Sequence, residues 1–80
     1  MEIKKGVFKI IRIIGDKGEA YVREIIRNTK MSSATVVKRL RELEIDGYVT
    51  SYRKCRRKYY KLTGKGQKLY IMTKIFGYIF

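Results

Sequence analysis

The spacing of apolar residues changes at Gly47, and this change limits the folds open to the chain. Before Gly47, apolar residues recur three or four positions apart, which is the spacing of one buried helix face. After it, β-branched and aromatic residues alternate with polar ones, as in a strand with one buried face. A chain of 80 residues has room for one small core. The pattern predicts a single domain over residues 1–80, mainly α with a small β-hairpin (α+β).

Three helices with apolar residues at helical spacing are expected over residues 2–14, 20–29 and 32–46. The first is expected to stop at the stretch Gly-Asp-Lys-Gly, 15–18, because glycine and aspartate favour turns. Ser32 is a good N-cap for the third, and Gly47 suits the left-handed position behind it. The buried face of this third helix is expected to hold Val36, Leu40 and Leu43.

Residues 48–62 are expected to form an antiparallel hairpin, because aromatic and β-branched residues stand on both sides of a polar stretch. That stretch, 53–58, contains no glycine or Asn-Gly signal, so its loop is expected to be longer than two residues. Thr63 is a suitable N-cap for a final helix. We divide the domain into a core over residues 1–62 and a C-terminal dimerisation helix over 63–80.

The charge of the chain is strongly positive and unevenly distributed. The formal net charge is +13, from 20 Lys and Arg against 7 Asp and Glu. All seven acids precede Gly47, and residues 47–80 hold nine bases and no acid. A densely negative partner is therefore expected, either nucleic acid or an anionic membrane surface.

Several functional classes find no support in the residues present. With one cysteine and no histidine, the chain lacks the ligands of a zinc site, and no metal or cofactor is expected. Ser32 and Ser33 have no histidine to act as a base, so we do not expect an enzyme. No effector pocket is readable. The longest uncharged runs are too short to span a bilayer, and a single cysteine favours an intracellular protein.

The order helix, helix, helix, hairpin, helix is the layout of a winged-helix domain, in which the hairpin is the wing. The segment "MSSATVVKRLRELEIDGYV" resembles the recognition-helix region of winged-helix regulators, and "YYKLTGKGQKL" resembles the second wing strand of MarR-like and PadR-like regulators. The resemblance covers residues 5–70, with Lys30 where many relatives have a glycine. Size and composition are also similar to small winged-helix proteins of archaea and their viruses.

The resemblance implies a homodimeric transcriptional regulator that binds specific double-stranded DNA, in the cytoplasm with the nucleoid or in the host cytoplasm if the protein is viral. Helix 32–46 would then lie in the major groove. With its apolar face inward, Lys38 and Arg41 point outward and can donate to guanine. Arg39 lies nearer the core, within reach of a phosphate or an acid. The expected contacts of this helix are Ser32, Ser33, Ala34, Thr35, Val37, Lys38, Arg39 and Arg41.

The basic stretch of the hairpin is expected to bind the DNA backbone or enter a minor groove. Its candidate residues are Arg53, Lys54, Arg56, Arg57 and Lys58. The expected dimer interface consists of Phe8, Ile11, Leu69, Met72, Phe76, Ile79 and Phe80.

Other interpretations remain open. The protein is alternatively a sequence-tolerant chromatin or DNA-packaging protein, a winged-helix protein adaptor, or a membrane-surface protein. The hairpin tyrosines either stack on single-stranded bases or pack the sheet against the core, with Tyr60 the best candidate for burial. Cys55 is expected to be a passive exposed thiol, although a disulfide between chains stays open.

Overall fold

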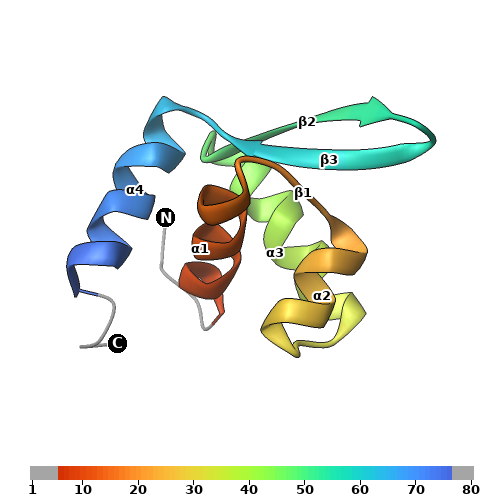
Figure 1. Ribbon diagram of the computed structural model, residues 1–80, viewed down its shortest axis with the longest axis horizontal. Coiled ribbons are helices and arrows are strands. Elements are labelled where there is room, and N and C mark those ends of the chain that lie inside the picture. Colours follow the sequence, from red (N-terminus) through yellow and green to blue (C-terminus); the bar gives the residue numbers. More distant parts are fainter. Residues whose placement is uncertain (1–5, 77–80) are drawn as a thin grey trace.

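The computed structural model describes residues 6–76. Helices α1, α2 and α3 lie under a three-stranded antiparallel sheet of order β1-β3-β2, and α4 stands beside α1 (Figure 1). The elements are α1 (Val7–Lys17), β1 (Ala20–Tyr21), α2 (Val22–Thr29), α3 (Ser33–Ile45), β2 (Val49–Lys54), β3 (Arg57–Leu62) and α4 (Gly64–Phe76). This is the predicted winged-helix arrangement, with the β2-β3 hairpin as the wing.

The core lies between the first three helices and one face of the sheet. Seven aliphatic side chains from these helices are fully buried: Ile10, Ile11, Ile14, Ile25, Val36, Leu40 and Leu43. Each contributes roughly 1.5–3 kcal/mol by leaving water. The predicted inward face of α3 is thus confirmed. Tyr60 closes the core from the sheet and is buried, as expected.

The turn between α2 and α3 uses a lysine in a conformation that usually favours glycine. Lys30 has φ 59° in the left-handed region and donates its backbone N–H to Ile26 O at 2.9 Å. Lys30 thus adopts a conformation that glycine takes without strain, with the strain of a side chain added. Ser32 then caps α3, because its Oγ accepts a hydrogen bond from Thr35 N at 3.2 Å, as predicted.

The wing is a tight hairpin rather than one with a long tip. Its strands pair from Val49 with Leu62 as far as Lys54 with Arg57, so only Cys55 and Arg56 form the turn. These two residues have φ of 52° and 65°, the geometry of a two-residue turn that matches the twist of the strands. The expected loop of more than two residues is wrong. Glycine or asparagine usually marks such a turn, and neither is present.

Two other boundaries differ from the predicted ones. Helix α1 continues through Gly15 to Lys17 and ends at Gly18, which has φ 85°. The segment before α2 is a short strand instead of the first turn of a helix, and its Ala20 and Tyr21 pair with Tyr60 and Tyr59 of β3. A strand of two residues has no periodicity of its own, so only its pairing with β3 reveals it.

Helix α4 packs against α1 of the same chain. A Cβ on Gly15 would lie 2.3 Å from the ring of Tyr70, so glycine lets this ring rest on α1. The Tyr70 hydroxyl donates a hydrogen bond to Asp16. Contacts between elements far apart in sequence thus make α4 part of the single-chain core.

This packing corrects part of the predicted dimer interface. Ile11 and Leu69 lie in the core, exposed by 0% and 8%, and cannot form a surface for a second chain. Phe8 packs against the core and is half-buried. Met72 is 53% exposed, so it does not share the buried face of Leu69. The side chain of Phe76, together with Ile79 and Phe80, lies outside the described residues.

The first turn of α4 is fastened to the start of the wing. Thr63 donates its N–H to Tyr48 O at 3.1 Å, and its hydroxyl caps the helix by accepting from Gly66 N, also at 3.1 Å. A Cβ on Gly66 would lie 2.0 Å from Tyr48 O, whereas one on Gly64 would meet nothing within 4 Å.

Gly66→Ala should therefore destabilise the protein by about 1–3 kcal/mol or more, because the backbone of Tyr48 must move. Gly64→Ala is the matched control and should leave stability unchanged or slightly raised. Urea denaturation of both variants measures the difference. Equal stability of the two alanine variants would contradict the close contact at Gly66.

The wing tip and α4 lie at opposite ends of the longest dimension of the molecule, which measures 37 Å (Figure 1). Within residues 6–76, no helix has the length and apolar character needed to cross a bilayer.

Candidate nucleic-acid interface

One side of α3 is exposed and carries two cations that have no partner among residues 6–76. Ala34, Lys38 and Arg41 are exposed at positions that share one face, and Val37 beside them is 39% exposed. Among residues 6–76, neither Lys38 nor Arg41 has an ion pair or a side-chain hydrogen bond. Both long side chains are therefore available to a partner outside the chain.

The acids nearest to this face are engaged elsewhere. Glu42 Oε1 lies 3.0 Å from Arg39 Nη1 in an ion pair. Glu44 accepts a hydrogen bond from the Ser51 hydroxyl at 2.8 Å, which ties the end of α3 to the wing. Helix α3 thus does not neutralise Lys38 and Arg41 with its own carboxylates.

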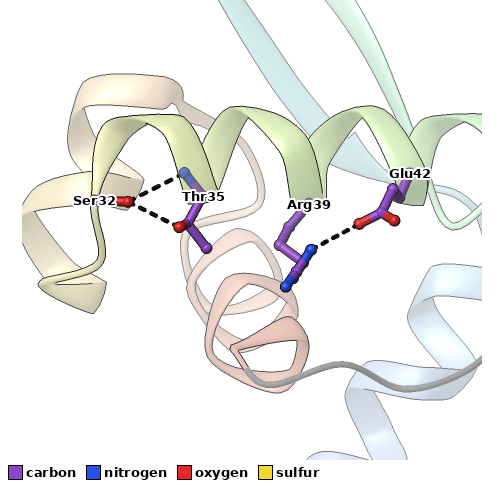
Figure 2. Close-up of polar contacts among 4 residues, drawn as sticks. All are labelled: Ser32, Thr35, Arg39 and Glu42. Atoms are coloured by element: carbon purple, nitrogen blue, oxygen red, sulfur yellow. Dashed lines mark hydrogen bonds and ion pairs between the residues drawn. The ribbon is translucent and has the colours of Figure 1, made fainter.

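A second row of α3 residues lies on a different side of the helix. Figure 2 shows Ser32, Thr35, Arg39 and Glu42 along this row, with Arg39 directed toward the start of α1. The Ser32 hydroxyl donates to Thr35 Oγ1 at 2.8 Å. Arg39 reaches an acid, one of the two partners expected for it. Ser32 and Ser33 are exposed at the helix start.

The five basic residues of the wing are all exposed, on the strands as well as in the turn. Arg53 pairs with Lys58 and Lys54 with Arg57, so like charges stand directly opposite each other across the hairpin. Like charges in this position destabilise a sheet. Their placement therefore favours binding of an anion over stability of the free hairpin.

The wing presents positive charge on both of its faces, because residues directly opposite in the ladder share a face. Arg53 and Lys58 share the face of the buried Tyr60, on the side of the helices. Lys54 and Arg57 point to the other side, where the Arg57 guanidinium lies 4.5 Å from the centre of the Tyr21 ring. An anionic backbone passing the tip meets cations on either side.

A comparison with protein-family models matches residues 4–56 to the MarR family. This match spans α1, α2, α3 and β2, which is more than half of the chain. The protein belongs to the MarR family. MarR-family proteins are transcriptional regulators and not enzymes, in agreement with the prediction. No curated protein sequence matches the chain.

Solved structures share this winged-helix fold at low sequence identity. BpsR of Bordetella bronchiseptica has a TM-score of 0.86 and 18% identity, over 96% of this chain and 61% of that chain. Reduced MarR from E. coli has a TM-score of 0.83 and 19% identity, over 89% of this chain and 54% of that chain. Sso10a-2, a DNA-binding protein from Sulfolobus solfataricus, has a TM-score of 0.75 and 19% identity, over 95% and 81%. The chain thus spans only part of the length of these proteins.

Two features of this MarR-family chain were missed in the sequence. One is a pocket of about 490 Å³ between α1, the end of α2 and α4, and the other is the position of Tyr21 beside the hairpin tyrosines Tyr52 and Tyr59 on the outer face of the sheet. Residues far apart in the sequence form both features, so no local motif reveals them. Among residues 6–76, no group of three or more His, Cys, Asp or Glu could hold a metal ion.

Proposed function

We propose that the protein is a homodimeric transcriptional regulator that binds specific sequences of double-stranded DNA, with α3 in the major groove and the wing on the backbone or in a minor groove. The observation that carries this proposal is the exposed pair Lys38 and Arg41 on α3, which has no ion pair within residues 6–76 and lies adjacent to a wing with five exposed bases.

The chemistry of α3 suits the reading of base edges. Lys38 and Arg41 can donate to guanine O6 and N7, and a good bidentate contact discriminates by about 1–3 kcal/mol. Ala34 and Val37 offer apolar contacts to a thymine methyl group. Ser33 and Thr35 at the helix start could donate their hydroxyls to phosphate, and Ser32 would do so by giving up its hydrogen bond to Thr35 Oγ1. Arg39, held by Glu42, is proposed to contact a flanking phosphate.

The wing would contribute affinity without reading sequence. Lys and Arg on phosphates release counterions, which raises affinity for every duplex alike. A DNA-binding protein is expected where the DNA is, in the cytoplasm with the nucleoid.

Dimerisation follows from the length of site that one helix can read. One recognition helix contacts few base pairs, whereas a two-fold dimer doubles the site, with half-sites about one helical turn apart. Helix α4 exposes three large apolar side chains, Ile71, Met72 and Ile75, each by more than half. This face replaces the corrected part of the predicted interface, and Phe76, Ile79 and Phe80 stay candidates beside it. Since α4 lies opposite the wing tip, pairing through it would leave both wings outermost.

Selection of bound duplexes from a random pool tests the proposal, together with sedimentation of the free protein at micromolar concentration. A two-fold symmetric consensus and a dimer are expected. A pool that emerges without any consensus would instead favour the DNA-packaging function. A monomer that still selects a single half-site would contradict the proposed α4 interface while leaving the α3 assignment in place.

A second function is favoured by one buried group in the pocket between α1, α2 and α4. Arg12 Nε is buried and has no hydrogen-bond partner in the part of the chain that the structure describes, while Nη1 of the same side chain lies 3.5 Å from Thr73 O. Phe8, Lys9, Ile13 and Lys30 also line this pocket, so apolar walls adjoin cations. BpsR is a protein whose DNA binding is regulated by 6-hydroxynicotinic acid. We propose that this pocket takes a small aromatic acid that controls DNA binding.

Arg12→Met tests the effector pocket, because it keeps the length of the side chain and removes its charge. Calorimetry with 6-hydroxynicotinic acid should show binding weakened roughly 10- to 150-fold, as expected for loss of a hydrogen bond to a charged group, about 1.5–3 kcal/mol. Lys68→Met on the exposed side of α4 is the charge-matched control. If wild-type protein binds neither this acid nor other hydroxylated aromatic acids, the proposed effector role is wrong. The proposed DNA binding does not depend on that result.

A further inference from the structure

The face of the sheet turned away from the helices carries a cluster of three tyrosines, which we term the tyrosine face: Tyr21, Tyr52 and Tyr59. The three come from β1, β2 and β3 and stand beside one another in the strand register. The rings of Tyr52 and Tyr59 lie 5.7 Å apart and nearly parallel, at 22°. Tyr21 meets Tyr59 at 5.6 Å and 76°. In Figure 1, α1, α2 and α3 all lie on the opposite side of the sheet.

Cations border these rings. The Arg57 guanidinium lies 4.5 Å from the centre of the Tyr21 ring, and Lys61 Nζ lies 5.8 Å from that of Tyr52. Lys54, opposite Arg57 in the ladder, adds a third exposed base to this face. The tyrosine face therefore combines π surfaces with positive charge at its edges.

Two acids touch this cluster, and both have partners: Glu24 accepts from Tyr21 N at 3.2 Å and pairs with Lys17. Glu19 accepts a hydrogen bond from the Tyr52 hydroxyl. This bond raises the pKa of Tyr52 to about 12 and ties the Glu19 carboxylate to the edge of the face. An anionic partner meets a surface dominated by Lys54, Arg57 and Lys61.

Three half-buried aromatic rings beside cations suit one class of partner in particular. Unpaired bases stack on aromatic side chains, while Lys and Arg bind the phosphates between them. In a duplex the faces of the bases are covered by neighbouring bases, so tyrosine rings cannot stack on them. We infer that the tyrosine face binds single-stranded nucleic acid, at a site separate from the duplex site proposed for α3.

The two sites lie on different sides of the molecule. Helix α3 packs beneath the sheet, on the face of Tyr60, whereas the tyrosine face lies above it (Figure 1). A duplex held by α3 leaves Tyr59, in the middle strand, uncovered. The wing cations Lys54 and Arg57 adjoin both sites, so a single strand on the rings and a duplex on α3 would meet at them, as at the edge of a melted region.

Binding of a fluorescent oligothymidylate of about a dozen nucleotides tests the inference, because this homopolymer cannot pair with itself. Oligouridylate of equal length is the second arm, which separates single-stranded DNA from RNA as the preferred source of the same chemistry. Tyr59→Leu removes the central ring and should weaken binding of the preferred strand roughly 5- to 100-fold, the range for loss of one stacked base. Tyr59→Phe keeps the ring and should bind as the wild type does. Both variants should keep wild-type affinity for duplex DNA and an unchanged circular dichroism spectrum.

The inference would be overturned if wild-type protein bound neither homopolymer, if Tyr59→Leu bound as well as wild type, or if one equivalent of duplex displaced the single strand completely. The double variant Lys38→Ala, Arg41→Ala distinguishes failure of the single-strand inference from failure of the proposed duplex binding. It should lose specific duplex binding and keep binding of the single strand. Loss of both would assign the single strand to α3 and refute the separate site.

Discussion

Replacing the five wing bases Arg53, Lys54, Arg56, Arg57 and Lys58 with serine should abolish most of the affinity for any duplex. Each lost phosphate contact makes the slope of log affinity against log salt shallower by about 0.9, so five contacts would change it by about 4.5. At about 0.1 M salt the affinity should fall on the order of 10³-fold or more, equally for cognate and random sequences. Titration of both duplexes over a range of salt concentrations measures the slope directly.

The folded state provides an internal check on this result. Because Arg53 faces Lys58 and Lys54 faces Arg57, removal of these charges relieves repulsion, and the serine variant should be no less stable than wild type. A control variant with Lys68 and Lys74 replaced by serine removes exposed charge from α4, at the far end of the molecule. If that control changes the salt slope as much per removed charge as the wing variant does, the net charge and not the wing governs binding. If specific binding falls while random binding persists, the wing reads bases.

The double variant Lys38→Ala, Arg41→Ala should have the second largest effect, and on specificity rather than on general affinity. Each side chain is expected to contribute about 1–3 kcal/mol of discrimination at its own base pair. Together they should reduce the ratio of cognate to random affinity by roughly 30-fold or more, since about 1.4 kcal/mol corresponds to tenfold. Both positions are exposed, and alanine suits a helix interior, so stability should not fall.

Competition of selected and random duplexes for each variant gives this ratio. Arg27→Ala is the matched control, because it removes an exposed arginine from the neighbouring helix α2. It should change both affinities by the same factor. Proportional losses on cognate and random DNA in the Lys38 and Arg41 variant would reduce these residues to backbone contacts and would favour the DNA-packaging function.

The charges of this chain are arranged for a partner rather than for the stability of the free fold. Few acids lie near the basic residues that face outward, and those near α3 are tied to Arg39 and Ser51. The wing keeps like charges opposite each other. Binding of an anion would relieve this repulsion, so duplex DNA is expected to raise the melting temperature as well as to occupy the surface.

Local patterns in the sequence predicted much of the fold. The spacing of Val36, Leu40 and Leu43 set the inner face of α3, and Ser32 and Gly47 marked its ends. These features depend on neighbours within about one helical turn, and such interactions are read directly from residue order. The outward position of Lys38 and Arg41 follows from the same periodicity. The sequence by itself thus determined the mainly α fold with its wing, the exposed side of α3 and the basic character of the hairpin.

Only the tertiary structure decided which surfaces remain free. It paired Ala20 and Tyr21 with β3, tightened the wing turn at Cys55 and Arg56, and placed Ile11 and Leu69 in the core. These outcomes depend on contacts between residues distant along the chain, where several local choices are compatible with the same periodicity. An apolar stripe shows that a face is buried, but its partner is set by how all helices and strands fill one core volume. The same long-range packing created the Arg12 pocket and the tyrosine face.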